Sequence, residues 1–209
     1  MIFEIGIPTL NRVDLLYPSI YMYATKDFKS RIHILDNGGE QFKNKQLPHN
    51  VSLISMKSNI GVAASWNMLC RTIFQKSDYA LILNDDIYLG RNQLQIENLL
   101  PKDKKPFFLK ATIDWCAFII SKSMFQEIGA FNEEFFPAYY EDNSYEYRMK
   151  LKGYKARTNP LLNPFVYNSS QTLEKAPRIA DAVKNNKRIY IEMWGGEPHK
   201  EKFTKPYNK

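Results

Sequence analysis

Cysteine and histidine are scarce in this chain of 209 residues, which contains two cysteines and three histidines. Cys70 and Cys116 lie far apart in the sequence, and each sits within an apolar run. We therefore expect two buried free thiols, which suits a reducing compartment, rather than a disulfide framework. The sequence also lacks a zinc-finger pattern and an RNA-recognition signature, so we expect no nucleic-acid partner.

Glycine-rich phosphate-binding loops are absent as well. The nine glycines form neither the dinucleotide-binding fingerprint nor the loop that ends in a phosphate-binding lysine. A nicotinamide-dependent enzyme and a P-loop nucleoside triphosphatase are therefore disfavoured.

Long apolar runs are missing too. No window approaches the roughly 18 uninterrupted apolar residues of a membrane-spanning helix, and the N-terminus has no charged leader followed by an apolar stretch. We expect no transmembrane segment and a cytoplasmic location. The length, without an internal repeat or a low-complexity linker, indicates a single domain over residues 1–209.

Positive charge is what the chain does have. The formal net charge is +7, and lysine and arginine are scattered through the sequence. Their densest cluster lies in the last quarter, at Lys184, Lys187, Arg188, Lys200, Lys202 and Lys205. This cluster is either a solvated basic face or a surface that attracts phosphates or a membrane.

Apolar strands alternate with amphipathic helices in the first half of the chain. Strands are predicted at 3–8, 31–35, 51–54, 79–83, 107–109, 117–120 and 165–167, and helices at 13–25, from 59 onward, at 141–152 and at 177–190. Pro8 is expected to stop the first strand, because proline cannot donate to a ladder. The order is typical of an α/β domain with a mainly parallel, Rossmann-like central sheet flanked by helices, a mixed C-terminal half and an irregular tail.

Polar side chains follow three of the predicted strands. The first strand ends at Pro8 and is followed by Thr9, Asn11 and Arg12. The second is followed by Asp36 and Asn37, and the fourth by Asn84, Asp85 and Asp86. Ligands of an open α/β sheet bind at the carboxyl ends of its strands. We therefore expect a binding site at this edge.

The adjacent carboxylates of Asp85 and Asp86 are the most informative feature of that edge. Two neighbouring carboxylates repel one another unless a cation or solvent offsets their charge. A hard divalent ion with oxygen ligands would do so, especially where substrate phosphates complete its shell. Taken in isolation, the same pair is an ordinary solvated turn after a strand.

Three further features have two interpretations each. Asp36 either belongs to a simple Asp-Asn-Gly-Gly turn or accepts a hydrogen bond from the imide nitrogen of uracil. Glu141 and Asp142 open a predicted helix, where they either complement its dipole or supply a general base for an acceptor hydroxyl. Trp194, which precedes two glycines, is either a hinged aromatic lid or an anchor that pins the tail to the body.

Taken in order, these motifs resemble the GT-A fold glycosyltransferases, in particular the large family-2-like group. The matching segments are IPTLNR at 7–12, LDNG at 35–38, SNIGVAASWN at 58–67, LNDDI at 83–87 and IGAFNEEFF at 128–136, leading to YED at 140–142. They cover about residues 2–155. The compact size and the Trp194-Gly195-Gly196 tail are also similar to small glycosyltransferases of large algal viruses, which would place the protein in the host cytoplasm.

The resemblance implies a role for each matching residue. Pro8, Thr9, Asn11 and Arg12 would line the nucleotide pocket, Asp36 would meet uracil, and Asn59 would lie near the ribose or diphosphate. Asn84, Asp85 and Asp86 stand where the family carries its Asp-X-Asp motif, so Asp86 would bind the Mn²⁺ or Mg²⁺ that bridges the diphosphate and Asp85 would approach the ribose or the ion. Asp142 of the Glu141-Asp142 pair would be the base, and Asp114, Trp115 and Trp194 would contribute to the donor pocket.

The chain departs from the family pattern at two places. The first acid of Asp-X-Asp is Asn84, which weakens metal binding or shifts it onto Asp85. The family often has a histidine after the late strand, where this chain has Tyr167 and Asn168. His199 either takes over as a metal ligand or is an ordinary surface histidine in the tail.

The predicted activity is metal-dependent transfer of a hexosyl or deoxyhexosyl group from a UDP-sugar to a hydroxyl of a glycan or glycoprotein. An inverting mechanism with Asp142 as base is expected, and a retaining one stays open. Residues 1–100 would form the nucleotide-binding half, 101–170 the acceptor and catalytic half, and 171–209 the C-terminal helix and tail. The alternatives are a sugar nucleotidyltransferase, a non-catalytic nucleotide-sugar-binding module and a basic nucleic-acid-binding domain.

Overall fold

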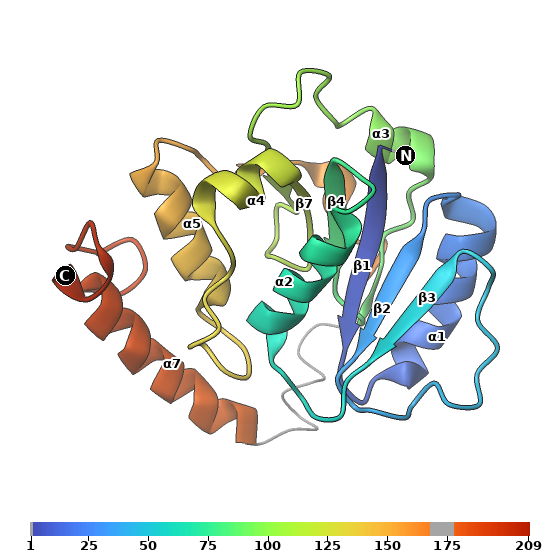
Figure 1. Ribbon diagram of the computed structural model, residues 1–209, viewed down its shortest axis with the longest axis horizontal. Coiled ribbons are helices and arrows are strands. Elements are labelled where there is room, and N and C mark those ends of the chain that lie inside the picture. The colour runs from blue at the N-terminus through green and yellow to red at the C-terminus, as the bar shows by residue number, and fades with distance from the viewer. Residues whose placement is uncertain (1, 168–177) are drawn as a thin grey trace.

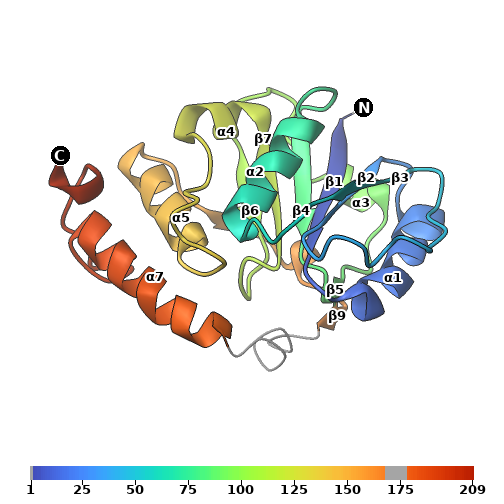
Figure 2. The same cartoon turned by 60° about the horizontal axis from the view of Figure 1, so that its bottom comes forward.

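A mixed sheet forms the centre of the computed structural model, which describes residues 2–167 and 178–209. Its strands are β1 (Phe3–Thr9), β2 (Ile32–Asp36), β3 (Val51–Ser55), β4 (Tyr79–Leu83), β6 (Phe108–Lys110), β7 (Ala117–Ser121) and β8 (Arg157–Thr158). They lie in the order β3-β2-β1-β4-β7-β6-β8 (Figure 1). A separate antiparallel ribbon consists of β5 (Ile87–Tyr88) and β9 (Val166–Tyr167) (Figure 2).

The two halves of the sheet differ in strand direction, as the sequence predicts. β1 pairs in parallel with β2 and β4, and β2 pairs in parallel with β3. β7 runs antiparallel to β4 and β6, and β8 runs parallel to β6. Because β7 is reversed, the segment that precedes it lies at the same edge of the sheet as the segments that follow β1, β2 and β4.

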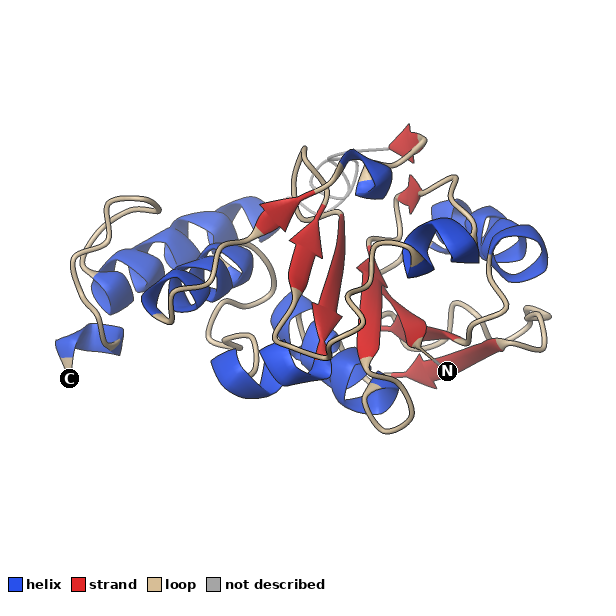
Figure 3. Cartoon of the chain, turned by 90° about the horizontal axis from the view of Figure 1, so that it is seen from above, coloured by secondary structure: helices blue, strands red, loops and turns tan. Residues whose placement is uncertain are grey.

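Helices cover both faces of the sheet (Figure 3). One face packs against α1 (Val13–Met22), its π-helical continuation η1 (Tyr23–Asp27) and α3 (Gln93–Glu97). The other packs against α2 (Val62–Ile73), α4 (Lys122–Ile128) and α5 (Glu141–Leu151). α7 (Arg178–Trp194) lies outside α5, and the short 3-10 turns η2 (Pro160–Leu162) and η3 (Pro206–Asn208) complete the described elements.

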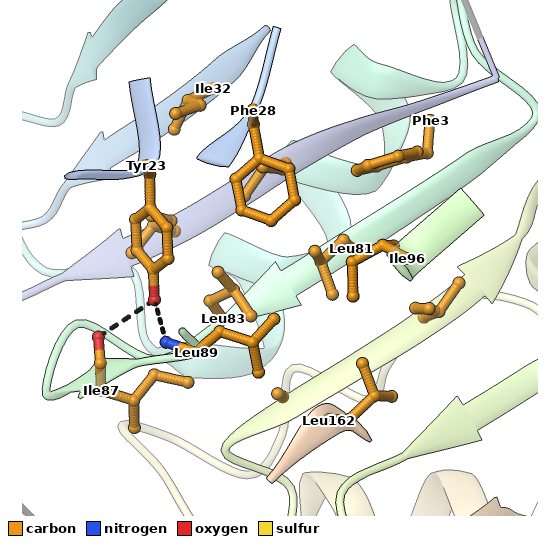
Figure 4. Close-up of a cluster of buried hydrophobic side chains, with 14 of the residues drawn as sticks. Phe3, Tyr23, Phe28, Ile32, Leu81, Leu83, Ile87, Leu89, Ile96 and Leu162 are labelled. Atoms are coloured by element: carbon orange, nitrogen blue, oxygen red, sulfur yellow. Dashed lines mark hydrogen bonds between the residues drawn. The ribbon is translucent and has the colours of Figure 1, made fainter. Parts of the chain in front are cut away.

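The core on the α1 face is closed by a buried tyrosine. Leu16 and Ile20 of α1 are fully buried, as is Tyr23 at the start of η1. The Tyr23 hydroxyl donates to the carbonyl oxygen of Ile87 at 3.2 Å and accepts from the N–H of Leu89 at 2.9 Å (Figure 4). Burial raises the pKa of Tyr23, so it remains a neutral donor and ties β5 to the sheet.

The α2 face confirms the predicted apolar stripe. Trp66, Leu69 and Ile73 are buried against the sheet. The Trp66 ring packs edge-on against Phe118 of β7 and Phe131, each at a centroid distance of 5.1 Å. Burying each such side chain contributes roughly 1.5–3 kcal/mol, so α2 is held by its apolar stripe.

Pro8 does not stop the first strand, contrary to the prediction. β1 continues to Thr9, and Pro8 is in register with Leu35 of β2. The N–H of Ile5 donates towards the β2 side, to Arg31. The backbone N–H and C=O groups of residues at even positions of β1 therefore point towards β4, and the pairing of β1 with β4 ends at Gly6. The donor that Pro8 lacks would point at a side without a partner strand, so the ladder loses nothing.

Several element boundaries differ from the sequence predictions. The first helix changes to a π-helix after Met22, and the short elements β5, α3, α4 and β8 were not predicted. The last helix extends to Trp194, beyond the predicted end at Tyr190. Its predicted start at Pro177, and Asn168 in the family comparison, lie outside the described residues.

Trp194 ends α7 rather than belonging to an irregular tail. It is 1% exposed, its ring packs edge-on against Tyr147 at 5.0 Å, and its indole N–H donates to Ser144 at 3.2 Å. Gly195 adopts φ +74, and its N–H bonds back to Ile191 at 2.8 Å. A glycine in this conformation is a common helix terminator. The Trp-Gly-Gly motif is therefore an anchor and a helix end, not a hinged lid.

Two coarse expectations can be compared with the structure directly. Cys70 and Cys116 are both buried and free, as predicted. Among residues 2–167 and 178–209, no helix combines the length and the apolar character needed to cross a membrane.

Candidate functional site

A cavity of about 360 Å³ opens at the edge of the sheet where β1 and β4 end. Its polar lining includes Thr9 at the end of β1, Asn84, Asp85 and Asp86 after β4, Asp114 before β7, and Glu141 and Asp142 at the start of α5. The reversed direction of β7 brings Asp114 to this edge. The predicted residues Pro8, Asn59 and Trp115 also line the cavity.

Asp85 and Asp86 are held at the cavity by the buried end of β4. The N–H of Asn84 bonds to the carbonyl oxygen of Cys116 at 2.8 Å, which fixes the turn. Burial, and to a lesser extent the charge of Asp86, raise the pKa of Asp85 to about 6, while the Thr9 hydroxyl, a backbone N–H and Arg12 oppose the shift. Burial is also the main cause of the raised pKa of Asp86. Both carboxylates therefore carry an uncompensated desolvation cost.

Asp114 joins this acidic group from the far side of β4. Its carboxylate accepts the N–H of Cys116 at 2.6 Å and the hydroxyl of Tyr167 in β9. The charge of Asp114 is one cause of the raised pKa of Asp86, and both carboxylates line the same cavity. Tyr167 itself lines the cavity.

Glu141 and Asp142 form the second acidic pair, at the first turn of α5. Burial, followed by the charge of Asp142, raises the pKa of Glu141 well above its ordinary value. Burial also raises the pKa of Asp142, against the opposing effects of the Asn143 N–H and Lys110. The Asp142 carboxylate accepts the Asn143 N–H at 2.7 Å. The helix dipole favours both charges, but burial outweighs it.

The donor set suits a hard divalent cation that completes its shell with substrate. The buried oxygen Oδ1 of Asp86 makes no hydrogen bond to the described residues, and the charges of Asp86 and of its neighbours Asp85 and Asp114 interact within the cavity lining. No cluster of three or more histidine, cysteine or acidic side chains in residues 2–167 and 178–209 has the geometry of a complete metal site. One or two carboxylates plus phosphate oxygens is the usual arrangement for Mg²⁺, so these residues fit such an ion.

Three predicted nucleotide-binding residues do not line the cavity. Asn11 is exposed and accepts from Gln41 at 3.1 Å. Arg12 is 2% exposed and bonds to Asp14, and its charge lowers the pKa of Asp85 and Asp86. Asp36 is fully buried, and its oxygens accept from Gly38 at 2.8 Å and from the side chain of Gln41 at 3.2 Å. The carboxylate of Asp36 therefore stabilises the turn that follows β2.

Trp194 and His199 also lie apart from the cavity lining. Trp194 is packed inside the α5–α7 contact, so its predicted place in the donor pocket is not seen. His199 is exposed in the turn after α7, and its backbone N–H donates to Glu201 at 2.9 Å. The structure does not bring it together with Asp85 and Asp86.

Other lining residues were not among the predicted site residues. They include Leu10, Asn37, Val62, Trp66, Cys116, Pro137, Ala138, Tyr139 and Tyr167. Asn37 follows β2 and was noted as a polar strand end, so that signal was available. Tyr139 and Tyr167 belong to segments that reach the cavity only through the packing of α5 and β9, which spacing in the sequence does not reveal.

Comparisons with known proteins give matches in structure alone. No protein-family profile and no curated protein sequence matches the chain. The chain is similar to the mannosyltransferase PcManGT from Pyrobaculum calidifontis in complex with GDP-Man and Mn²⁺, with TM-score 0.63 and 11% identity over 90% of this chain and 64% of that one. It thus spans less than two thirds of that protein's length.

The chain matches a larger share of two further solved structures. A Drosophila β-1,4-galactosyltransferase 7 in complex with manganese, UDP-Gal and xylobiose gives TM-score 0.52 and 12% identity over 83% of this chain and 73% of that one. A cytidylyltransferase from Leptospira borgpetersenii gives TM-score 0.51 and 12% identity over 90% and 94%. The expected viral resemblance has no counterpart among these three structures. Together with the strand order and the position of the acidic cavity, the likeness shows that the chain has the GT-A fold.

Proposed function

We propose that the protein is a glycosyltransferase that takes a nucleoside-diphosphate sugar into this cavity and transfers the sugar to an acceptor hydroxyl. The supporting observation is that carboxylates approach one cavity from two sides, Asp85 and Asp86 after β4 and Glu141 and Asp142 at the start of α5. The first pair suits a diphosphate with its cation, and the second suits removal of a proton. Two of the similar structures are glycosyltransferases in complex with a sugar nucleotide and manganese.

On the donor side, Asp86 would hold Mn²⁺ or Mg²⁺, together with Asp85 or Asp114. When bound, such an ion neutralises charge that builds on the leaving diphosphate. Asn84 lines the cavity but offers only a neutral amide oxygen, so the charge needed to hold the ion comes from its two acidic neighbours. Arg12, buried behind the pair, favours their ionised state.

On the acceptor side, Asp142 is the better candidate for the base. The pKa of Glu141 is raised well above its ordinary value, and Glu141 has a buried oxygen without a hydrogen bond to the described residues. It is therefore the member of the pair that more readily keeps a proton. Asp142 has Lys110 nearby to favour its ionised form, and its raised pKa makes it a stronger base than an ordinary carboxylate.

The proposed step is a single displacement. The acceptor oxygen attacks the anomeric carbon, its proton passes to the Asp142 carboxylate, and the bond from that carbon to the phosphate oxygen breaks with the electron pair leaving on the diphosphate. Attack from the side opposite the leaving group inverts the anomeric configuration. The proposed acceptor is a glycan or glycoprotein, and the transferred group is a hexosyl or deoxyhexosyl group.

The proposed nucleotide is uridine diphosphate, with Asp36 as the acceptor for the imide N–H of uracil. That hydrogen bond is at present made by the side-chain amide of Gln41, which donates to Asp36 at 3.2 Å. The Gln41 amide nitrogen also donates to Asn11, and its oxygen accepts from Val13 at 3.4 Å. Entry of uracil at this position therefore requires the Gln41 side chain to move.

A sugar nucleotidyltransferase is the second candidate function. The similarity to a cytidylyltransferase over 94% of its length favours keeping it. Against it, β1 ends in Pro8-Thr9 and is followed by Leu10 rather than by a glycine-rich loop.

Because both buried cysteines are unbridged, the proposed compartment remains the cytoplasm, where thiols stay reduced.

A donor panel tests the function. The purified chain is incubated with UDP-, GDP- and CDP-sugars and acceptor sugars, with Mn²⁺ or with EDTA, and nucleoside diphosphate, pyrophosphate and glycoside product are measured. We expect nucleoside diphosphate and glycoside in equal amounts with Mn²⁺, and none with EDTA. Pyrophosphate release in a parallel incubation with nucleoside triphosphates and sugar phosphates would instead establish the nucleotidyltransferase, and donor binding without any turnover would establish a binding module.

Replacing the proposed base tests the mechanism. Asp142→Asn keeps the size of the side chain and removes its basicity, so transfer should fall by about 10²–10⁴-fold, with donor affinity by calorimetry changed little. Asp103→Asn, at an exposed acid paired with Lys105, is the control and should keep full activity. An Asp142→Asn variant that turns over at the wild-type rate would show that another residue is the base.

A further inference from the structure

One polar side chain of α7 is completely buried beside the catalytic segment. Asn186 is 0% exposed, although it lies at the centre of a helix whose neighbouring residues Asn185 and Lys187 are exposed. Its amide nitrogen donates to the carbonyl oxygen of Ala138 at 2.8 Å and to that of Tyr139 at 3.2 Å. Both carbonyls belong to the segment that leads into Glu141 and Asp142.

That segment has an unusual backbone conformation. Tyr139 and Tyr140 have φ values of 77° and 76°, so two consecutive residues with large side chains occupy the left-handed region. Each such residue is strained relative to an ordinary conformation, and this kind of strain persists only where the surroundings impose it. The carbonyl of Tyr140 then accepts the N–H of Ser144 at 2.9 Å, so α5 begins directly from the strained pair.

The contacts of α7 account for how the strain is held. The Tyr140 ring packs against Tyr190 of α7 at 5.5 Å, and Tyr190 also packs against Phe135 at 6.2 Å. These rings fix the outer side of the segment, and Asn186 binds its carbonyls. α7 therefore holds the segment from Phe135 to Tyr140 in two ways, through the ring packing of Tyr190 and through the hydrogen bonds of Asn186.

The cost of burying Asn186 indicates that its two hydrogen bonds matter. Its oxygen Oδ1 is buried without a hydrogen-bond partner among the described residues. A buried unsatisfied acceptor is destabilising, and a leucine, which is larger but branches at the same carbon, would carry no such acceptor. An asparagine at this position is thus explained by its amide donors rather than by packing.

The segment that Asn186 holds reaches the cavity. Ala138 and Tyr139 both line it, next to Glu141 and Asp142. Besides burial, the charges of Glu141, Asp86 and Asp142 raise the pKa of the Tyr139 hydroxyl, which places this ring among the carboxylates. A change in the backbone at Tyr139 would move both the ring and the first turn of α5.

We propose that Asn186 is a positioning residue for the reaction, which holds the Tyr139-Tyr140 backbone in its left-handed conformation and thereby aims Glu141 and Asp142 into the cavity. The C-terminal helix is then a working part of the site, although none of its described residues lines the cavity. This proposal rests on the proposed transferase function.

The test compares Asn186→Leu and Asn186→Ala with Asn185→Ala. Asn185 is the exposed neighbour on the same helix, and its side chain accepts from Arg188, so it is a matched control. We expect both Asn186 variants to lower kcat by on the order of 10- to 100-fold, as displacement of a catalytic group by a fraction of an ångström does. The calorimetric affinity for UDP with Mn²⁺ should stay within about twofold, since the donor side is untouched. Asn185→Ala should behave as wild type.

Two measurements separate positioning from a general loss of stability. Asn186→Leu removes one unsatisfied oxygen but leaves the carbonyls of Ala138 and Tyr139 without their donor, so a lower unfolding midpoint is expected and kcat is measured at a temperature at which the variant is fully folded. Its acid limb of kcat/KM against pH should shift, because the surroundings of Asp142 change. A variant whose kcat loss only follows its unfolded fraction, with an unchanged pH profile, would overturn the proposal.

A readout without turnover keeps this proposal distinct from the proposed function. Amide hydrogen exchange of residues 138–142 should rise in Asn186→Leu and stay unchanged in Asn185→Ala. If the donor panel gives no transfer with the wild type, the function fails, but increased exchange would still establish that Asn186 holds the segment. Unchanged exchange in Asn186→Leu would refute the positioning role even in an active enzyme.

Discussion

At the scale of single residues, the acidic site is built at a cost to stability. Burial raises the pKa of Asp85, Asp86, Glu141 and Asp142 alike. A fold that needed only stability would not place four desolvated carboxylates around one cavity. Sites built for binding or catalysis commonly carry such a cost.

The cost at Asp85 has a defined pH dependence. Its pKa is about 6 in the folded chain, against an ordinary value of 3.8, so the folded state binds the proton more tightly than the unfolded state. The free energy of unfolding therefore falls as pH rises from 3.8 to about 6. The penalty is absent below this window and complete above it.

Asp85→Asn should remove this penalty. We expect the variant to gain roughly 1–2 kcal/mol over the wild type above the window, after allowance for the partial exposure of the side chain, and to gain nothing below it. Urea unfolding at both pH values measures the difference. Asp103→Asn, at an exposed carboxylate, should not show such a gain above the window, and an equal effect of Asp85→Asn at both pH values would contradict the desolvation argument.

The residues of the site were predictable to the extent that they follow strands. Asp85, Asp86 and Thr9 lie directly at strand ends, so the rule for open α/β sheets places them at the cavity. Asp36 obeys the same rule and yet does not line the cavity, because the turn after β2 satisfies its carboxylate internally. The rule locates a residue at the edge of a sheet, but the local hydrogen bonds decide whether it faces the ligand.

At the scale of elements, the strands and helices with a strong apolar pattern were predicted well. β4 agrees with the prediction to the residue, and α5 differs only at its last residue. These elements are specified by their own burial, which a sequence records as an apolar run or stripe. The short elements α3 and α4 were missed because a helix of one or two turns carries too few apolar residues to define a period.

Trp194 shows the other limit of the sequence at this scale. A tryptophan before two glycines is compatible with a lid or with an anchor, and only tertiary contacts distinguish the two. Tyr147 and Ser144 of α5 receive its ring and its indole N–H. The same packing of α7 on α5 brings Asn186 to the carbonyls of Ala138 and Tyr139, a contact between residues 47 or 48 apart in the sequence.

At the scale of the whole molecule, the charge of the site opposes the charge of the chain. The formal net charge is +7, yet five carboxylates line the cavity. A diphosphate entering alone would meet like charge, which is strongly unfavourable in a partly buried site. The basic remainder of the surface would attract an anionic donor over a longer range, but the proposed binding of a diphosphate at the cavity would require a cation, which Asp86 would help to hold.

UDP and Mn²⁺ are therefore expected to stabilise the protein jointly. Either ligand alone should shift the thermal midpoint little, and both together should raise it by about 5–10 °C at concentrations near 100 times the dissociation constant. Asp86→Asn should abolish the joint shift, because it removes the carboxylate whose Oδ1 makes no hydrogen bond to the described residues, whereas Asp103→Asn should retain it. An equal shift with UDP in EDTA would show that the diphosphate is bound without the cation, and the acidic cavity would then need another explanation.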